Sequence, residues 1–160
     1  LPGRNTMAAI ASHSLRYVLN ITAAGVLFVA AGAAGAIDLI TDEEARLPAT
    51  PKMATRGGIT RGPSIKVVSP NPDGQVKAPF AMKVEFQPHG GSKIDANSVK
   101  VTYLRKPAID LTQRLKTAIS EAGINLGDAN VPAGAHDIKI DVTDAEGRTK
   151  SETVSFTVVK

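Results

Sequence analysis

Apolar and polar residues alternate in several short runs between residues 63 and 160, and this alternation limits the possible folds more than any other feature. The clearest run is 80–87, FAMKVEFQ, in which every second residue is apolar. A period of two places one set of side chains in a core and the other in water, as in a half-buried strand. We expect a single core formed by the apolar residues of these runs: Phe80, Met82, Val84, Phe86, Val99, Val101, Ile138, Ile140, Val142, Val154, Phe156 and Val158.

Turn-forming residues separate these runs. The segments are NPDG at 71–74, PHGG at 88–91 and DAEG at 144–147. Proline and glycine supply the fixed or positive φ angles that tight turns need. Short strands with turns between them are typical of an all-β sandwich. The sequence therefore predicts one antiparallel, all-β sandwich domain over residues 63–160.

One stretch departs from the period of two. Residues 110–122, DLTQRLKTAISEA, carry apolar side chains at helical spacing. Asp110 and Gln113 can form a capping box, and Gly123 can end a helix. We expect a short helix here, in a crossover between the two sheets. The alternative is an irregular crossover with a strand near residues 114–119.

The end of the chain resembles a known family. Residues 131–148, VPAGAHDIKIDVTDAEGR, are similar to a segment of bacterial immunoglobulin-like domains, in which a Pro-Gly turn leads into an alternating strand that ends in Asp-x-x-Gly. The run 63–86 also looks like the opening of that class, so the resemblance covers about residues 63–160. It implies an immunoglobulin-like sandwich and no particular function, since such folds carry many tasks. His136 stands where the class often has a tyrosine that pins a turn through its hydroxyl; a histidine can do so only through a ring nitrogen.

Residues 7–36 have the layout of a secretory signal peptide. Arg16 precedes a long apolar stretch, which ends in the small residues Ala34, Gly35 and Ala36. This layout predicts a leader over 1–36 that is cleaved after Ala36. The alternative is a retained membrane helix, because about 20 apolar residues can span a bilayer. Either reading exports the remainder, so we expect a periplasmic or secreted protein, tethered to the inner membrane if the leader is retained.

Residues 37–62 show no lasting periodicity and are interrupted by prolines and glycines. Such a segment buries little apolar surface, so the sequence predicts a flexible linker. A docking segment for an anionic surface is the alternative, because basic residues follow an acidic start.

Composition restricts the possible partners. Without the leader, 17 basic residues face 15 acidic ones, and the net charge of about +2 gives no support to nucleic-acid binding. The chain has no cysteine, so an exported form holds together without disulfides. Aromatic residues are few, which weakens the case for a sugar-binding platform.

No catalytic motif, cofactor motif or metal site emerges from the sequence. His89 and His136 are far apart and no cysteine accompanies them, whereas a zinc site needs three or four ligands. Asp95, Asp144 and Glu146 could meet a calcium ion, but turn chemistry explains them more simply.

The densest group of positive charges lies on the crossover, which we take as residues 105–127. Its members are Arg105, Lys106, Arg114 and Lys116, and we predict a contact surface there because binding residues concentrate on loops. The expected function is a non-catalytic interaction or structural module of a bacterial cell envelope. Polysaccharide binding is the alternative and a small hydrolase the least favoured function. An apolar strand edge would favour a protein partner, an exposed Tyr103 a sugar, and a buried His136 beside a carboxylate and a serine an enzyme.

Overall fold

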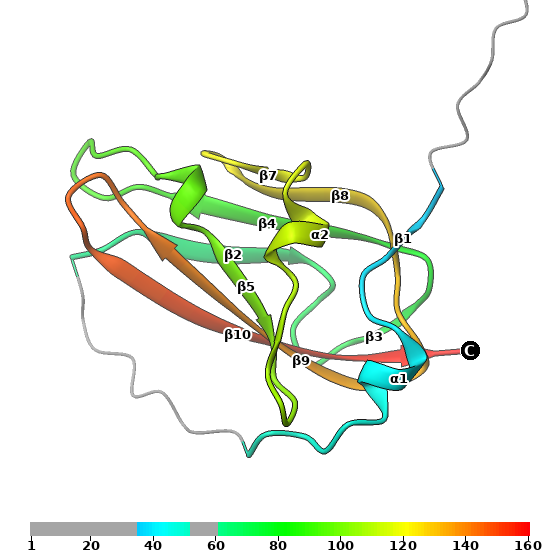
Figure 1. Cartoon of the computed structure of the whole chain (residues 1–160). Coiled ribbons are helices and arrows are strands. Elements are labelled where there is room, and N and C mark those ends of the chain that lie inside the picture. The colour runs from blue at the N-terminus through cyan, green and yellow to red at the C-terminus, as the bar shows by residue number, and fades with distance from the viewer. Residues whose placement is uncertain (1–34, 52–60) are drawn as a thin grey trace, which may run out of the picture. The chain divides into compact units, whose positions relative to one another are not determined.

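The computed structural model describes residues 35–51 and 61–160, and two packed β-sheets make up most of this part of the chain (Figure 1). The first sheet contains β1 (Ile37–Asp38), β2 (Ser64–Ser69), β4 (Phe80–Gln87), β7 (Ile119–Ser120) and β8 (Gly123–Asn130). The second contains β3 (Gln75–Lys77), β5 (Lys100–Tyr103), β6 (Ile109–Asp110), β9 (Gly134–Thr143) and β10 (Thr149–Val159). The helices are α1 (Asp42–Ala45), α2 (Thr112–Leu115) and a 3-10 turn at Ala96–Ser98. The predicted all-β sandwich is confirmed.

The strand order is β1-β8-β4-β2 in the first sheet, with β7 also beside β8, and β3-β10-β9-β5-β6 in the second. Most pairs are antiparallel; β1 with β8 and β3 with β10 are parallel. After β2 the chain leaves the first sheet, and β3 joins the second. The strand that opens the sandwich is therefore divided between both sheets.

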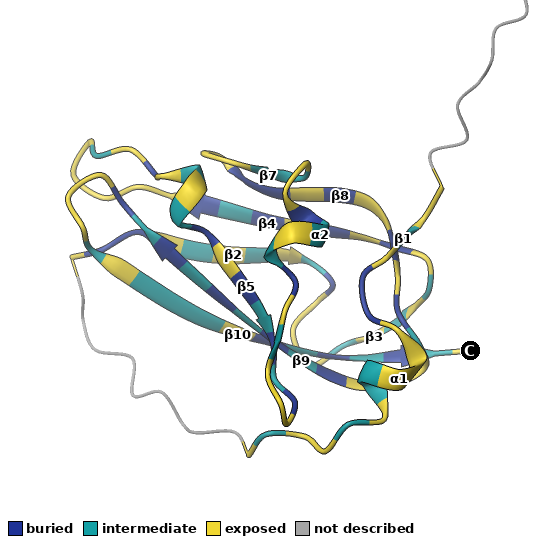
Figure 2. Cartoon of the chain, in the orientation of Figure 1, coloured by how far each residue is buried: buried dark blue, intermediate teal, exposed yellow. Residues whose placement is uncertain are grey.

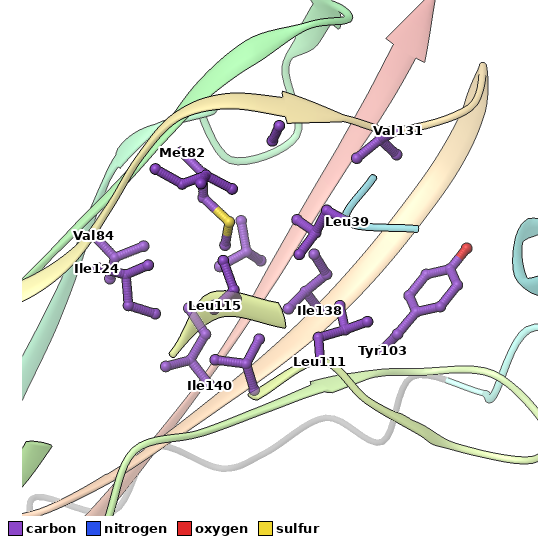
Figure 3. Close-up of a cluster of buried hydrophobic side chains, with 14 of the residues drawn as sticks. Leu39, Met82, Val84, Tyr103, Leu111, Leu115, Ile124, Val131, Ile138 and Ile140 are labelled. Atoms are coloured by element: carbon purple, nitrogen blue, oxygen red, sulfur yellow. The ribbon is translucent and has the colours of Figure 1, made fainter. Parts of the chain in front are cut away.

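The core lies between the sheets, and all twelve residues predicted for it are buried (Figures 2 and 3). The most exposed of them is Phe80 at 8%. Its ring meets that of Phe156 edge to face, with centroids 5.5 Å apart, an arrangement that aromatic pairs favour. The period of two in the sequence thus assigned every one of these side chains to the correct face.

The predicted helix over 110–122 is much shorter than expected. Helix α2 has four residues and is followed by strand β7, so the region combines a helical turn with a short strand close to the one in the alternative. Leu111 and Leu115 are fully buried, so this turn packs on the core. The helical spacing of the apolar residues reflects one buried turn rather than a full helix.

The expected capping box does not form either. The residue before α2 is Leu111, which provides no side-chain cap. The carboxylate of Asp110 instead accepts a hydrogen bond from the backbone N–H of Thr112 at 2.8 Å. This bond spans two residues, which is the pattern of an Asx turn.

Gly123 does not end a helix; it begins β8, a strand that the sequence did not predict. The segment GINLGDAN contains mostly residues that are depleted in strands. It nevertheless pairs antiparallel with β4 and buries Ile124, Leu126 and Ala129. Pairing with a strongly patterned neighbour overrides the weak preference of this segment.

The predicted flexible linker over 37–62 differs from the structure in its described part. Leu39 is completely buried, Ile40 is 2% exposed, and strand β1 pairs with β8. We call residues 37–50 the amino-terminal strap, because they run along the edge of the first sheet and then reach the second (Figure 1). Residues 37–62 were expected to bury little apolar surface, but Leu39 and Ile40 alone bury enough to fix the start of this segment on the sandwich.

Most of the predicted leader, residues 1–34, lies outside the described residues, as does 52–60 of the predicted linker. Within the described part, no helix has the length and hydrophobicity needed to cross a bilayer.

Candidate functional site

Arg105, the first of the four predicted binding residues, is used inside the protein. Its side chain is largely buried, and its Nε–H donates to the hydroxyl of Tyr103 at 2.9 Å. One terminal nitrogen donates to the carbonyl of Ala135 at 2.7 Å, and the guanidinium carbon lies 4.8 Å from the centre of the Tyr103 ring. Arg105 therefore connects β5 to the start of β9 instead of facing a partner.

Tyr103 and His136 form the centre of this buried network. One ring nitrogen of His136, Nε2, lies 2.8 Å from the carbonyl oxygen of Pro132, and a carbonyl can only accept, so Nε2 carries a proton. The other nitrogen, Nδ1, lies 2.8 Å from the Tyr103 hydroxyl and, in the neutral ring, accepts a hydrogen bond from it. His136 thus holds the turn at Pro132 through a ring nitrogen, which is the only way in which a histidine can do so.

Burial governs the ionisation of both groups. Desolvation lowers the pKa of His136 below 6.5, against the raising effect of its bond to Pro132, and the nearby charge of Arg105 lowers it further. Desolvation likewise raises the pKa of Tyr103 above 10.0. The network is therefore built from a neutral imidazole and a neutral phenol beside one cation.

A carboxylate and a serine do lie near His136, since Asp137 follows it in the sequence and Ser155 is opposite Asp137 on β10, but they form a separate pair. The Ser155 hydroxyl donates to Asp137 Oδ1 at 2.5 Å on the outer face of the sheet. His136 points inward, and its two nitrogens are bonded to Tyr103 and Pro132. The imidazole has no free nitrogen with which to take a proton from Ser155, so this arrangement does not form a catalytic triad.

Arg114 holds the strap against the crossover. Two of its nitrogens each lie 2.7 Å from an oxygen of Glu44, and one of them also donates to the carbonyl of Leu39 at 2.8 Å. The hydrogen bond from Arg114 is the main reason that the pKa of Glu44 falls to about 2. This bidentate pair joins residues 70 positions apart in the sequence.

Lys106 and Lys116 are exposed, unlike the two arginines. The backbone N–H of Lys106 donates to the carbonyl of Pro48, so this loop also contacts the strap. The four residues do not form one positive surface, because the two arginines act within the molecule.

Asp144 organises a turn, which agrees with the turn interpretation of its sequence context. Its Oδ1 accepts the backbone N–H groups of Glu146 and Arg148 at 3.0 and 2.9 Å, and its Oδ2 accepts the Arg148 side chain at 2.7 Å. Desolvation opposes ionisation of Asp144, yet these bonds together lower its pKa. In the described residues, no three histidine or acidic side chains gather as metal ligands would.

Hollows of about 430, 340 and 300 Å³ lie on the surface of the described residues. Sugar sites commonly offer an aromatic face, but the four aromatic residues of the described part are all buried: Phe80, Phe86, Tyr103 and Phe156. Tyr103, whose exposure would favour a sugar ligand, is completely buried.

Strand β2 leaves one edge of the first sheet open. It pairs with β4, and no other described strand pairs with its outer side. Val68, at an irregularity in this pairing between Val67 and Ser69, is 44% exposed and is the one large hydrophobic residue exposed in the described part. Strand β2 thus exposes one apolar residue, Val68, beside the polar Ser64 and Lys66, on an edge whose unpaired backbone can accept a further strand.

The partners of Arg114 were not predicted from the sequence. The motif Thr41-Asp-Glu-Glu44 matches a capping box and could have indicated the start of α1. The structure contains both of its bonds: Glu44 N–H to the Thr41 hydroxyl at 3.3 Å and Thr41 N–H to the Glu44 carboxylate at 2.9 Å. Nothing in the sequence pairs Glu44 with Arg114, since that contact depends on the fold.

Comparison with known proteins yields distant structural likeness only. No family model and no curated protein matches the chain. CopC from Methylosinus trichosporium OB3b is 16% identical over 59% of this chain and 93% of its own, with a TM-score of 0.41. An engineered protein is 20% identical, and the match covers 61% of this chain and 20% of that protein, with a TM-score of 0.42. The endo-beta-1,4-mannanase from Thermotoga petrophila is 12% identical, and the match covers 66% of this chain and 21% of the mannanase, with a TM-score of 0.44. Likeness at this level does not extend to ligand or reaction.

Proposed function

We propose that this protein is a non-catalytic, extracytoplasmic module that binds another protein of a bacterial cell envelope, and that its domain is immunoglobulin-like. The open edge of β2, with Val68 exposed on it, carries the proposal of a protein partner. Export rests on the predicted leader.

The strand order supports the immunoglobulin-like assignment. Such domains have sheets in the order ABED and CFG. The strands β2, β4, β8 and β7 follow the first order, and β5, β9 and β10 follow the second. The pinned turn at His136 lies near the start of β9, where a tyrosine corner would lie in such a domain.

An edge strand can recruit a partner by main-chain pairing. Its outward N–H and C=O groups accept an extended segment as an added strand, and alternate side chains give specificity. The irregularity at Val68 interrupts this edge, so added pairing is confined to Ser64–Val67 with Val68 as an apolar contact. The absence of exposed aromatic rings in the described part makes polysaccharide the weaker candidate.

Site-specific photo-crosslinking tests the β2 edge. A photoreactive residue is placed at Val68 in one variant and at the exposed Asn97 in a control, and each is irradiated in envelope preparations. We expect a discrete protein adduct from position 68 alone. Equal adducts from both positions, or none from position 68 together with co-sedimentation on cell-wall polysaccharide, would reject the protein-binding edge.

A further inference from the structure

The crossover already holds a peptide segment in this structure, and that segment is the chain's own strap. We infer that the crossover and the adjoining end of β8 form a peptide-recognition site that the strap occupies in cis. Its ligand class is an acidic peptide that begins extended with two adjacent branched apolar residues and carries a glutamate, in a short helical turn, four positions after the second. The strap has this pattern at Leu39, Ile40 and Glu44.

Main-chain pairing aligns the strap. Strand β1 lies parallel to β8, with Ile37 beside Ala129. Beyond β1, the N–H of Leu39 donates to the carbonyl of Asn130 at 3.0 Å, and the carbonyl of Leu39 accepts from Arg114 at 2.8 Å. Both backbone groups of Leu39 are therefore satisfied by the sandwich, as in recognition by strand addition.

Side chains supply the selectivity. Leu39 and Ile40 are buried, and Figure 3 shows Leu39 beside Ile138 in the core cluster. Arg114 then clamps Glu44 through two bonds, a geometry that distinguishes a carboxylate from an amide. An apolar anchor at Leu39 and Ile40 and a charge clamp on Glu44 in the helical turn that follows make a specific site.

The far end of the strap is held by the loop that follows β5. The Lys106 N–H donates to the carbonyl of Pro48 at 3.0 Å, and the Thr50 N–H donates to the carbonyl of Leu104 at 3.3 Å. Helix α1, between the two anchored ends, buries none of its residues. The strap is thus attached at both ends and also in the middle, where Glu44 bonds Arg114 and Ala45 packs against the core.

The covalent connection makes the strap a competitor of any peptide in trans. A tethered segment acts at an effective concentration of roughly millimolar, so an outside peptide binds only when it displaces the strap. The strap is therefore an autoinhibitory segment as well as a model of the ligand. This site is independent of the β2 edge, because β1 and β2 lie on opposite sides of the first sheet.

Cutting the tether in the full chain tests the inference. A recognition sequence for a specific protease replaces residues 53–59, the protein is cut, and a fluorescent peptide of residues 37–51 is added. We expect the cut strap to remain with the sandwich on gel filtration and the labelled peptide to replace it. A peptide with Glu44→Gln should bind at least about tenfold more weakly. Its matched control, Glu43→Gln, should bind like the original, because Glu43 is exposed.

Three results would overturn the inference. One is the absence of exchange up to about 1 mM peptide, the concentration at which the tether acts. Another is loss of the β-sheet circular dichroism on cutting, which would make the strap a constitutive part of the core. The third is equal affinity of the two glutamine peptides, which would remove the role of Arg114.

Discussion

The hydroxyl of Tyr103 on β5 donates to Nδ1 of His136 on β9, at 2.8 Å, inside the sandwich. The direction of this bond follows from the other ring nitrogen, because Nε2–H of His136 donates a hydrogen bond to the carbonyl of Pro132 and Nδ1 is therefore the acceptor. A second proton on the ring would face the Tyr103 oxygen, which already accepts from Arg105. The network therefore tolerates the neutral imidazole and opposes the charged one.

Acid should destabilise the protein through His136. Its pKa is lowered in the folded state, so the unfolded state binds more protons below pH 6.5, and stability falls as the pH decreases from there towards the folded pKa. The free energy of unfolding decreases by at most about 1.4 kcal/mol per pH unit for one such group. Urea unfolding at pH 7.5 and 5.5 measures it, and His136→Gln should flatten this dependence. An unchanged dependence in that variant would contradict the assignment.

Arg105 and Lys106 should behave differently although they are neighbours. Truncation of Arg105 leaves the Ala135 carbonyl without its hydrogen bond from Arg105, so Arg105→Ala should cost about 2 kcal/mol. Lys106 is exposed, and Lys106→Ala should change stability by less than about 0.5 kcal/mol. Denaturation midpoints of the two variants check this. Similar losses would mean that Arg105 does not act within the core.

Gly123 should not tolerate a side chain. A Cβ there would lie 1.9 Å from the carbonyl oxygen of Val84, and its φ of +149° is one that other residues rarely adopt. We expect Gly123→Ala to cost about 3 kcal/mol or more, because β8 would have to move away from β4. Gly127→Ala is the control, since no atom lies within 4 Å of a Cβ at that position. Thermal melts of both variants decide the matter.

Phe86 and Lys83 lie on opposite faces of β4. Phe86→Ala should cost about 3–5 kcal/mol by leaving a cavity. Lys83→Ala should stay within about 0.5 kcal/mol, because its ion pair with Glu85 is exposed. Equal urea midpoints would show that the register of β4 is wrong.

The leader prediction has a direct test. Cleavage after Ala36 would give an exported chain that begins at Ile37, which is the first residue of β1. Intact-mass analysis of the exported protein measures this end. A mass that includes residues 18–36 would indicate a retained anchor instead.

The sequence by itself determined the sandwich and its core. The period of two in β4, β9 and β10 decides which side chains face inward, since neighbouring residues of a strand point to opposite sides. The turn contact of His136 could be anticipated as well, because it bonds Pro132, only four residues away. These features are local, and local patterns survive in a single sequence.

Only the tertiary structure decided the roles of the charged residues and of the strap. Arg105 and Lys106 look alike in the sequence, but one is buried against Tyr103 and the other faces solvent. Strand β8 forms because it pairs with β4. Leu39 is buried because the strap bonds the end of β8 and places this side chain in the core cluster. The bond between Glu44 and Arg114 joins segments 70 residues apart, and such a contact has no local pattern because only the fold brings its two partners together.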